Sequence, residues 1–295
     1  MILLDGKSLF SKIKIDLSLE VQSLIDNNKR APHLSAMLVG DNPASETYIN
    51  AKIKACAEIG FKSSVFTYPK DVSEKILLNK INTINDSDEI DGLIVQLPLP
   101  GHIDQDLITH SICHKKDVDG FHPVNIGRMV LGLNCFIPAT PFGIVNLLDE
   151  YNIETCGKKC LVIGRSHIVG TPISILMSRN KKRGNATVIL AHSKTQDLES
   201  LTKDADIIIV AIGSPNFLKS FMIKKDVVII DVGIHRIPSE KTKSGYKLVG
   251  DVDFEDVKNK ASYITPVPGG VGPMTIASLL KNTLFSAKKT IYSHT

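Results

Sequence analysis

The chain has 295 residues, of which 43% are apolar and 22% charged, and its formal net charge is +4. This profile indicates a globular protein whose length suits two domains. Aromatic residues make up only 5% and Trp is absent, which argues against stacking platforms for single-stranded nucleic acid, and the mild charge fits ordinary solvated surface or a small anionic substrate better than a polyanion.

The first half of the chain alternates between helical and strand-like segments. Apolar residues at helical spacing predict the first helix, and short apolar runs between turn signals predict strands. The predicted helices cover residues 8–29, 43–59 and 73–85, and the predicted strands cover 33–39, 65–68 and 91–97. This alternation favours a parallel sheet and the α/β class.

Residues 117–143 interrupt the alternation and are predicted to be irregular. A structureless stretch of this length inside a compact protein is usually functional. A helix over 141–151 is expected to follow it and to bridge two domains.

The second half resumes the same pattern. A helix is expected after Gly170, and the basic run 179–183 is expected to be an exposed helix end, where positive charge is favoured. The predicted strands cover 160–163, 186–190, 206–211 and 227–232, and the final helix covers 274–287.

Tyr48 and Lys52 are four residues apart on a predicted helix, so they share one face of it. A tyrosine hydroxyl beside a lysine that burial makes less basic can move protons in general acid–base chemistry. Taken alone, the spacing fits a surface aromatic–lysine pair better. Short-chain dehydrogenases also carry Tyr-x-x-x-Lys, but they place it after a glycine loop of the same domain, whereas here it precedes the loop.

Two further polar residues follow strand-like segments. Gln96 ends the strand DGLIVQLPLP, and strand ends face the ligand crevice in open α/β sheets. Its neutral amide can accept a hydrogen bond from Lys52 without forming an ion pair. Asp119, in the turn-like KDVDGF, can accept two parallel N–H bonds from a 2-amino-4-oxo heterocycle. The alternatives are an edge-capping amide for Gln96 and a turn former for Asp119.

The segment VIGRSHIVGTP resembles a dinucleotide-binding turn, with Gly164, Ser166 and Gly170 in the order G-x-S-x-x-x-G. A turn from a strand into a helix directs backbone N–H groups at an anion. A strand–helix turn without a ligand is the alternative.

The strand that follows this turn leads into His192-Ser193-Lys194 rather than into the carboxylate that usually binds the ribose of NAD. Ser193, Lys194 and Arg165 suit a 2′-phosphate instead, so the sequence favours NADP.

The cysteines indicate a reducing compartment, because an odd number without disulfide-like spacing is unusual in secreted proteins. They form no CxxC pair and no zinc-ligand cluster, so no metal is expected. The chain also lacks a signal peptide and an apolar run of the ~18 residues that a membrane helix needs. We therefore expect a cytoplasmic protein without a membrane or nucleic-acid partner. The five cysteines are Cys56, Cys113, Cys135, Cys156 and Cys160.

Several long segments, in order, resemble the bifunctional methylenetetrahydrofolate dehydrogenase/methenyltetrahydrofolate cyclohydrolase family, known as FolD in bacteria. The resemblance covers nearly the whole chain and implies two reactions: NADP-dependent oxidation of 5,10-methylenetetrahydrofolate to the 5,10-methenyl form, and hydrolysis of that cation to 10-formyltetrahydrofolate. The segments are SETYINAK, DGLIVQLPLP, KDVDGFHPVNIGRM, PATPFGI, VIGRSHIVGTP, HSKT, DVGI and TPVPGGVGPMT.

The resemblance also assigns roles to residues. It implies that Lys52 is the catalytic lysine of the hydrolytic half, that Tyr48 orients the folate, that Gln96 tunes Lys52 and that Asp119 binds the pterin amino edge. The implied walls of the folate site are Pro98, Leu99, Pro268, Gly269 and Gly270. The implied cofactor contacts are Gly164, Arg165, Ser166, Ser193 and Ile234, with Thr275 near the nicotinamide.

The implied architecture is an N-terminal α/β catalytic domain (1–142 and 275–295) plus a Rossmann-type NAD(P)-binding domain (143–274), with the ligands in a cleft between them. The family implies a homodimer, a tetrahydrofolate substrate that includes polyglutamylated forms, and a place in one-carbon metabolism and purine biosynthesis.

Two alternatives remain at this stage. One is another two-domain NADP-dependent dehydrogenase of the shikimate-dehydrogenase type, which would need a Lys/Asp pair in its own motif. The other is a non-catalytic dinucleotide-binding sensor, which would have no use for Tyr48, Lys52, Gln96 and Asp119 together.

Overall fold

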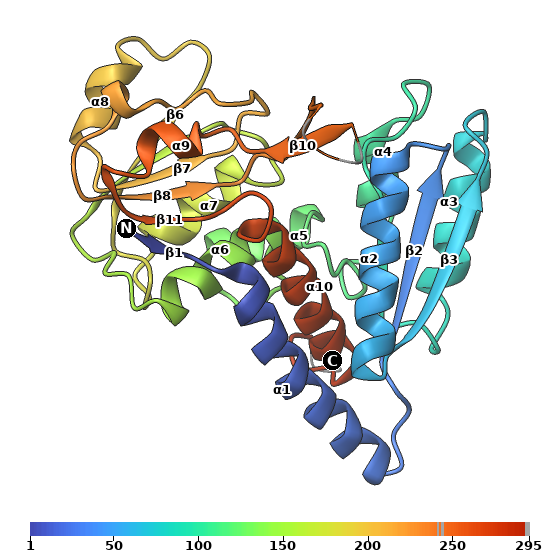
Figure 1. Cartoon of the computed structure of the whole chain (residues 1–295). Helices are drawn as coiled ribbons and strands as arrows, with labels where there is room; N and C mark the ends of the chain where they lie inside the picture. The colour runs from blue at the N-terminus through green and yellow to red at the C-terminus, as the bar shows by residue number, and fades with distance from the viewer. Residues whose placement is uncertain (241, 243–244, 293–295) are drawn as a thin grey trace. The chain divides into compact units, whose positions relative to one another are not determined.

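The computed structural model describes residues 1–240, 242 and 245–292, and its chain forms two compact units, which Figure 1 shows. Unit 1 contains Met1–Phe10 and Thr140–Thr275, and unit 2 contains Ser11–Ala139 and Ile276–Thr295. The predicted α/β class is confirmed in both units.

Unit 2 is built on a parallel sheet of three strands in the order β3-β2-β4. The central strand is buried along nearly its whole length, as its apolar sequence HLSAMLV predicts. The helices around the sheet bury apolar side chains against it, which is the main stabilising contribution. The strands are β2 (His33–Val39), β3 (Lys62–Tyr68) and β4 (Gly92–Val95), and the helices are α2 (Pro43–Ile59), α3 (Glu74–Asn85), α4 (Gln105–His110) and α5 (Pro123–Val130).

Helix α2 has local signals at both ends. The Asn42 side chain accepts hydrogen bonds from the amides of Ala44 and Ser45, at 2.9 and 3.4 Å, and Pro43 occupies the first turn. Gly60 ends the helix with φ of 83°, a conformation that favours glycine. These signals explain why its bounds were predictable from the sequence.

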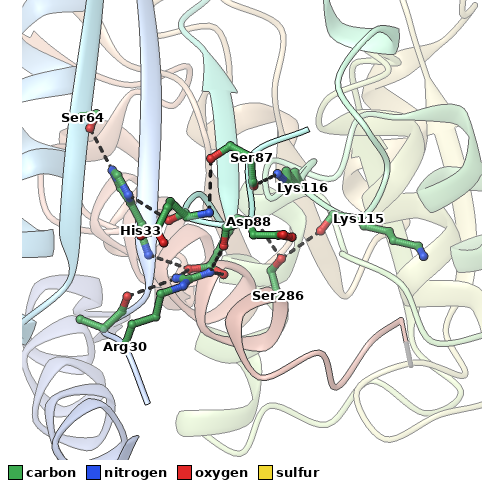
Figure 2. Close-up of polar contacts among 11 residues, drawn as sticks. Arg30, His33, Ser64, Ser87, Asp88, Lys115, Lys116 and Ser286 are labelled. Atoms are coloured by element: carbon green, nitrogen blue, oxygen red, sulfur yellow. Dashed lines mark hydrogen bonds and ion pairs between the residues drawn. The ribbon is translucent and has the colours of Figure 1, made fainter. Parts of the chain in front are cut away.

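A polar network ties together the amino ends of the strands in unit 2 (Figure 2). Arg30 donates through both terminal nitrogens to Asp91, at 2.6 and 2.8 Å, and the amide of His33 donates to the same carboxylate at 2.8 Å. The Ser286 hydroxyl, on the last helix, donates to the carbonyls of Asp91 and Lys115 at 2.7 and 2.9 Å. The network therefore connects segments that are almost 200 residues apart in sequence.

Unit 1 contains a parallel sheet of six strands in the order β1-β11-β8-β7-β5-β6. The chain leaves β5 for β6 on one side and returns to β7 on the other, so β5 lies at a topological switch point. The strands are β1 (Ile2–Leu3), β5 (Lys159–Ile163), β6 (Thr187–Ala191), β7 (Ile207–Val210), β8 (Val227–Asp231) and β11 (Ala261–Ile264).

The rest of unit 1 consists of short helices and a hairpin. The helices are α6 (Ala139–Glu150), α7 (Gly170–Ser178), α8 (Leu198–Asp204), η1 (Ser220–Met222) and α9 (Phe254–Val257), and the antiparallel hairpin is β9 (His235–Pro238) with β10 (Tyr246–Val249). Helices α1 (Gly6–Asp26) and α10 (Val271–Ala287) contribute residues to both units. Among the described residues, no helix combines the length and hydropathy needed to cross a membrane.

The prediction of an irregular segment was wrong, and the prediction of an exposed segment was confirmed only in part. The stretch 117–143 contains α5, whose first turn is capped by the ring nitrogen of His122 rather than by a recognisable Ser, Thr or Asp. The basic run 179–183 is exposed at residues 180–182, as predicted, but it follows α7 as a turn. The Arg183 side chain is only 10% exposed and donates to Asp149 at 2.9 Å and to the Ile153 carbonyl at 2.8 Å.

The first ten residues belong to unit 1, although the prediction placed 1–142 in the first domain. The reason is that β1 pairs with β11, with Ile2 opposite Tyr263 and Leu3 opposite Ile264. A two-residue strand carries too little periodicity to reveal its partner in the sequence.

Candidate active site

Helix α2 and the end of β4 bring Lys52 and Gln96 into contact. Lys52 is 8% exposed, and its Nζ donates to Oε1 of Gln96 at 3.2 Å. The Gln96 amide nitrogen Nε2 donates to the carbonyl of Leu97 at 2.9 Å, which directs Oε1 toward the lysine. The predicted pairing of these two residues is therefore present in the structure.

The surroundings of Lys52 disfavour its charged form. Burial lowers the pKa of Lys52, and the nearby Asp119 and Cys56 oppose this change only in part. The hydrogen-bond acceptor is a neutral amide, which stabilises an ammonium less than a carboxylate would. The amine is thus suited to accept a proton.

Asp119 is the acidic group whose charge most opposes the lowering of the Lys52 pKa. Burial raises its pKa to about 6, although Lys52 acts in the opposite direction and Asp117 adds to the rise. A carboxyl group with this pKa is mostly ionised at neutral pH and can accept N–H bonds from a ligand.

The loop that carries Asp119 is held by a residue that the sequence analysis did not single out. The buried carboxylate of Asp117 accepts hydrogen bonds from the amides of Gly120, Phe121 and His122, at 3.1, 3.1 and 2.8 Å, and from Nδ2 of Asn125 at 2.8 Å. Asp117 lies within the KDVDGF segment, so its position was visible, but its bonds were not.

Asn282 on α10 holds both flanks of the same loop. Its Nδ2 donates to the carbonyls of Val118 and Ile137, at 2.8 and 3.0 Å. The Ala139 amide then donates to the Asp119 carbonyl at 3.2 Å. Nothing in the sequence signals this role for Asn282, because its partners lie about 150 residues away.

The remaining predicted folate residues of unit 2 are close to this pair in the chain. Tyr48 is half-buried, one helical turn before Lys52 on the same face of α2. Leu99 is half-buried and Pro98 is exposed, just after Gln96.

The glycine turn in unit 1 joins β5 to α7. Gly164 has φ of 112°, and a Cβ there would lie 2.1 Å from the carbonyl oxygen of Ala211. A Cβ at Gly170 would lie 1.9 Å from the Gly164 carbonyl oxygen. Both positions therefore need glycine for a tight turn between strand and helix, as dinucleotide-binding loops do.

Ser166 occupies the middle of this turn. Its Oγ accepts from the amides of Val169 and Gly170, at 3.2 and 3.3 Å. A hydroxyl has two acceptor positions and one proton, so the Ser166 hydroxyl can still donate a hydrogen bond to an anion. Arg165 is exposed beside it, and its guanidinium has no hydrogen-bond or ion-pair partner among the described residues.

The loop after β6 contains no carboxylate until Asp197. The His192 ring and the Thr195 hydroxyl bond the loop's own amides, at 3.2 and 2.9 Å, and leave Ser193 and Lys194 exposed. Such a loop can accept a phosphate on a ribose without repulsion.

The other predicted residues of unit 1 are spread over its loops. Ile234 is 44% exposed after β8. Thr275 Oγ1 lies 3.0 Å from Thr140 Oγ1. The loop of Pro268, Gly269 and Gly270 packs on the start of α1, since the Lys7 amide donates to the Gly269 carbonyl at 2.9 Å.

The structure therefore places the predicted residues in two groups. Tyr48, Lys52, Gln96, Pro98, Leu99 and Asp119 belong to unit 2, whereas Gly164, Arg165, Ser166, Ser193, Ile234, Pro268, Gly269, Gly270 and Thr275 belong to unit 1. The cleft expected between the two domains stays a prediction.

Comparison with protein families agrees with this division. A model for the catalytic domain of tetrahydrofolate dehydrogenase/cyclohydrolase matches residues 4–119, and a model for the NAD(P)-binding domain of the same family matches residues 138–291. Membership of this family does not favour a shikimate-type dehydrogenase or a dinucleotide sensor.

Individual relatives match over nearly the full length. The bifunctional protein FolD of Flavobacterium johnsoniae is 57% identical over 98% of both chains. The bifunctional FolD methylenetetrahydrofolate dehydrogenase/cyclohydrolase of Campylobacter jejuni is 51% identical, with a TM-score of 0.92 over 98% of this chain and 99% of that one. The Trypanosoma brucei FolD, solved with NADP and an inhibitor, is 35% identical, with a TM-score of 0.93 over 99% of both chains. The chain therefore belongs to the tetrahydrofolate dehydrogenase/cyclohydrolase family, as the motifs of its sequence predicted.

Proposed function

We propose that this protein oxidises 5,10-methylenetetrahydrofolate with NADP and hydrolyses the resulting 5,10-methenyl cation to 10-formyltetrahydrofolate. The observation that carries the proposal is the buried Lys52 amine, bonded to a neutral amide inside a chain that matches the family along its whole length. We assign the folate to unit 2 and the dinucleotide to unit 1.

The hydrolytic half needs a base for water, and Lys52 is suited to that role. Its neutral amine accepts a proton from the water as the oxygen adds to the methenyl carbon. The bond from that carbon to N5 then breaks, N5 regains a proton, and the formyl group remains on N10. We assign to Gln96 the role of holding the amine in place without fixing its charge, and the 3.2 Å hydrogen bond between them supports this assignment.

Asp119 and Tyr48 are assigned to the folate. The ionised carboxylate of Asp119 accepts two N–H bonds from the amino edge of the pterin, and the anchored loop around Asp117 keeps it in position. Tyr48 orients the pterin beside Lys52, and Pro98 and Leu99 provide an apolar wall.

The residues of unit 1 suit NADP. Gly164 permits the tight turn, Ser166 retains a hydroxyl proton, and Arg165 and Ser193 are exposed for the 2′-phosphate. We also assign Ile234 and Thr275 to the dinucleotide. When bound, NADP supplies the acceptor for hydride. The protein's contribution to that step is orientation, because nitrogen already activates the donor carbon.

A spectrophotometric assay tests the proposal. The purified protein is mixed with 5,10-methylenetetrahydrofolate and either NADP or NAD, and formation and decay of the methenyl form are followed. We expect both activities, with kcat/KM at least about tenfold higher for NADP, because a charged contact from Arg165 and a hydroxyl contact from Ser193 to the 2′-phosphate distinguish the cofactors. Absence of methenyl formation would exclude the dehydrogenase assignment.

We further propose that the protein acts as a homodimer in the cytoplasm, on polyglutamylated as well as simple tetrahydrofolates. Its product is a formyl donor of the kind that purine biosynthesis consumes. The family membership supports these proposals, and light scattering on the purified protein measures the number of subunits directly.

A further inference from the structure

A buried carboxylate in unit 1, that of Asp251, contacts the loop after β7 and the first residue of β9. Its residue is 0% exposed, and it accepts from the backbone amides of Ile212, Gly213 and Ser214, at 2.8, 3.1 and 2.9 Å. Nε2 of His235 lies 2.7 Å from the same carboxylate. None of the sequence motifs used above includes Asp251.

A second buried carboxylate, that of Asp231, holds the backbone around Asp251 itself. It accepts from the amides of Gly233, Asp251 and Val252, at 3.0, 2.9 and 3.0 Å. Burial raises the pKa of Asp231 to about 7, because removal from water disfavours its charged form. Burying the ionised carboxylate of Asp231 thus destabilises the folded state at neutral pH. Apolar side chains in place of the two carboxylates would not carry this cost.

The two loops that Asp251 and Asp231 bond follow the carboxyl ends of neighbouring strands. Residues 211–214 come after β7, and residues 232–234 come after β8, which pairs with β7 in parallel. Ala211 is also the residue whose carbonyl oxygen approaches Gly164. In open α/β sheets the dinucleotide binds at this edge, beside the switch point. The two carboxylates therefore fix the loops next to the glycine turn.

The packing leaves little freedom in this network. A Cβ at Gly233 would lie 2.4 Å from the carboxyl carbon of Asp251, and a Cβ at Gly250 would lie 1.8 Å from Oδ2 of Asp231. The glycines of the segments DVGI and GDVDF are therefore required so that each carboxylate can pack on the opposite backbone. Ile234 lies between Gly233 and His235, so both of its neighbours contact Asp251.

We propose that Asp251 is a positioning residue for dinucleotide binding, which holds the loop 212–214 and the residues flanking Ile234 beside the glycine turn. The inference rests on the proposed function. A carboxylate is needed because three N–H groups converge on it, whereas an asparagine would direct its own N–H₂ at one of these donors.

The test is the isosteric variant Asp251→Asn, assayed in both reactions. We expect KM for NADP to rise by about tenfold or more, while kcat of the dehydrogenase changes by less than about twofold. Hydrolysis of 5,10-methenyltetrahydrofolate without NADP should keep the wild-type rate, because Lys52 and Asp119 belong to unit 2. The matched control is Asp253→Asn, since that carboxylate, two residues further on, bonds Lys219 at 2.8 Å and neither loop; it should leave KM unchanged.

A second variant, His235→Ala, removes a single contact of Asp251 and should raise KM for NADP about threefold. If Asp251→Asn does not fold, KM for NADP in His235→Ala tests the positioning role of Asp251. Calorimetric titration with NADP distinguishes the cofactor site from the role of Asp251. Wild-type protein that binds no NADP would exclude the proposed cofactor site. Equal NADP affinity in the wild type and in the folded variants would exclude only the role of Asp251.

Discussion

The two ends of the parallel sheet in unit 2 hold their cations in opposite ways. At the amino ends, Arg30 forms two hydrogen bonds with the carboxylate of Asp91, which raises the pKa of Arg30. At the carboxyl end of β4, Lys52 is more deeply buried and bonds a neutral amide, and its pKa is lowered. The charge of Arg30 is stabilised by a carboxylate, whereas the amine of Lys52, to which we assign a proton-accepting role, bonds only the neutral amide of Gln96.

The largest expected effect is that of Lys52→Met, which removes the base from the carboxyl-end site. We expect cyclohydrolase activity to fall by about a thousandfold or more, because methionine cannot accept the proton that we assign to the Lys52 amine. The fold should be kept, since an apolar side chain replaces a buried amine. Decay of methenyltetrahydrofolate absorbance measures the rate, with uncatalysed hydrolysis as the baseline; a normal rate would remove Lys52 from the mechanism.

Gln96→Glu would make the carboxyl-end site similar to the amino-end network. The new carboxylate should raise the pKa of Lys52, so that cyclohydrolase activity at pH 7 falls by about tenfold to a hundredfold and recovers as pH rises. The pH profile of kcat gives the answer. Gln96→Met, which adds no charge, is the matched control and should not shift the profile upward; an unshifted profile in Gln96→Glu would contradict the tuning role.

We expect folate binding through Asp119 to depend on pH. With a pKa of about 6 in the free protein, it is protonated below that pH and ionised above it. We therefore expect KM for the folate to fall by about tenfold per pH unit as pH rises toward 6 and then to level off. Asp119→Asn should give a higher KM that does not fall as pH rises toward 6. If KM of the variant still falls in this range, the pH dependence belongs to another group.

The raised pKa of Asp119 also has a consequence for stability. The folded value of about 6 lies above the ordinary 3.8, so the folded state binds a proton more tightly than the unfolded chain. The contribution of Asp119 is therefore fully present below about pH 4 and is lost as pH rises through 6. Urea unfolding of the wild type and of Asp119→Asn across this range measures the difference.

The smallest expected effect on catalysis comes from the amino-end network. Arg30→Met should leave kcat unchanged and lower the free energy of unfolding by about 2–3 kcal/mol, because the buried Asp91 loses its cation but keeps the His33 amide. Arg30→Lys should lie between, since lysine cannot form the bidentate pair. Urea denaturation at pH 7 measures both, and a loss of kcat in Arg30→Met would show that the two ends are coupled.

The sequence predicted the parts that local patterns determine. Asn42, Pro43 and Gly60 mark the ends of α2, and the spacing of Tyr48 and Lys52 on that helix indicated a shared face. The contact of Lys52 with Gln96 was predicted from chemistry and position, 44 residues apart.

The sequence could not predict contacts that depend on distant parts of the fold. The hydrogen bonds that Asp117 accepts and those that Asn282 donates join residues that no sequence pattern connects. Strand β1 and the hairpin β9–β10 are too short for periodicity to reveal them. Helix α4 was not predicted, although its cap is local. Asp104 stands just before the helix and accepts hydrogen bonds from two amides of its first turn, which is a signal that the sequence contains.

The role of Asn282 has a consequence for the order in which the molecule matures. The ribosome makes Lys52 and Asp119 before it makes Asn282 on α10, whose side-chain amide fastens the Asp119 loop. A nascent chain that ends before that helix thus has its chemical groups but not their fixed geometry. Hydrolytic competence is expected to arise only after α10 has been made.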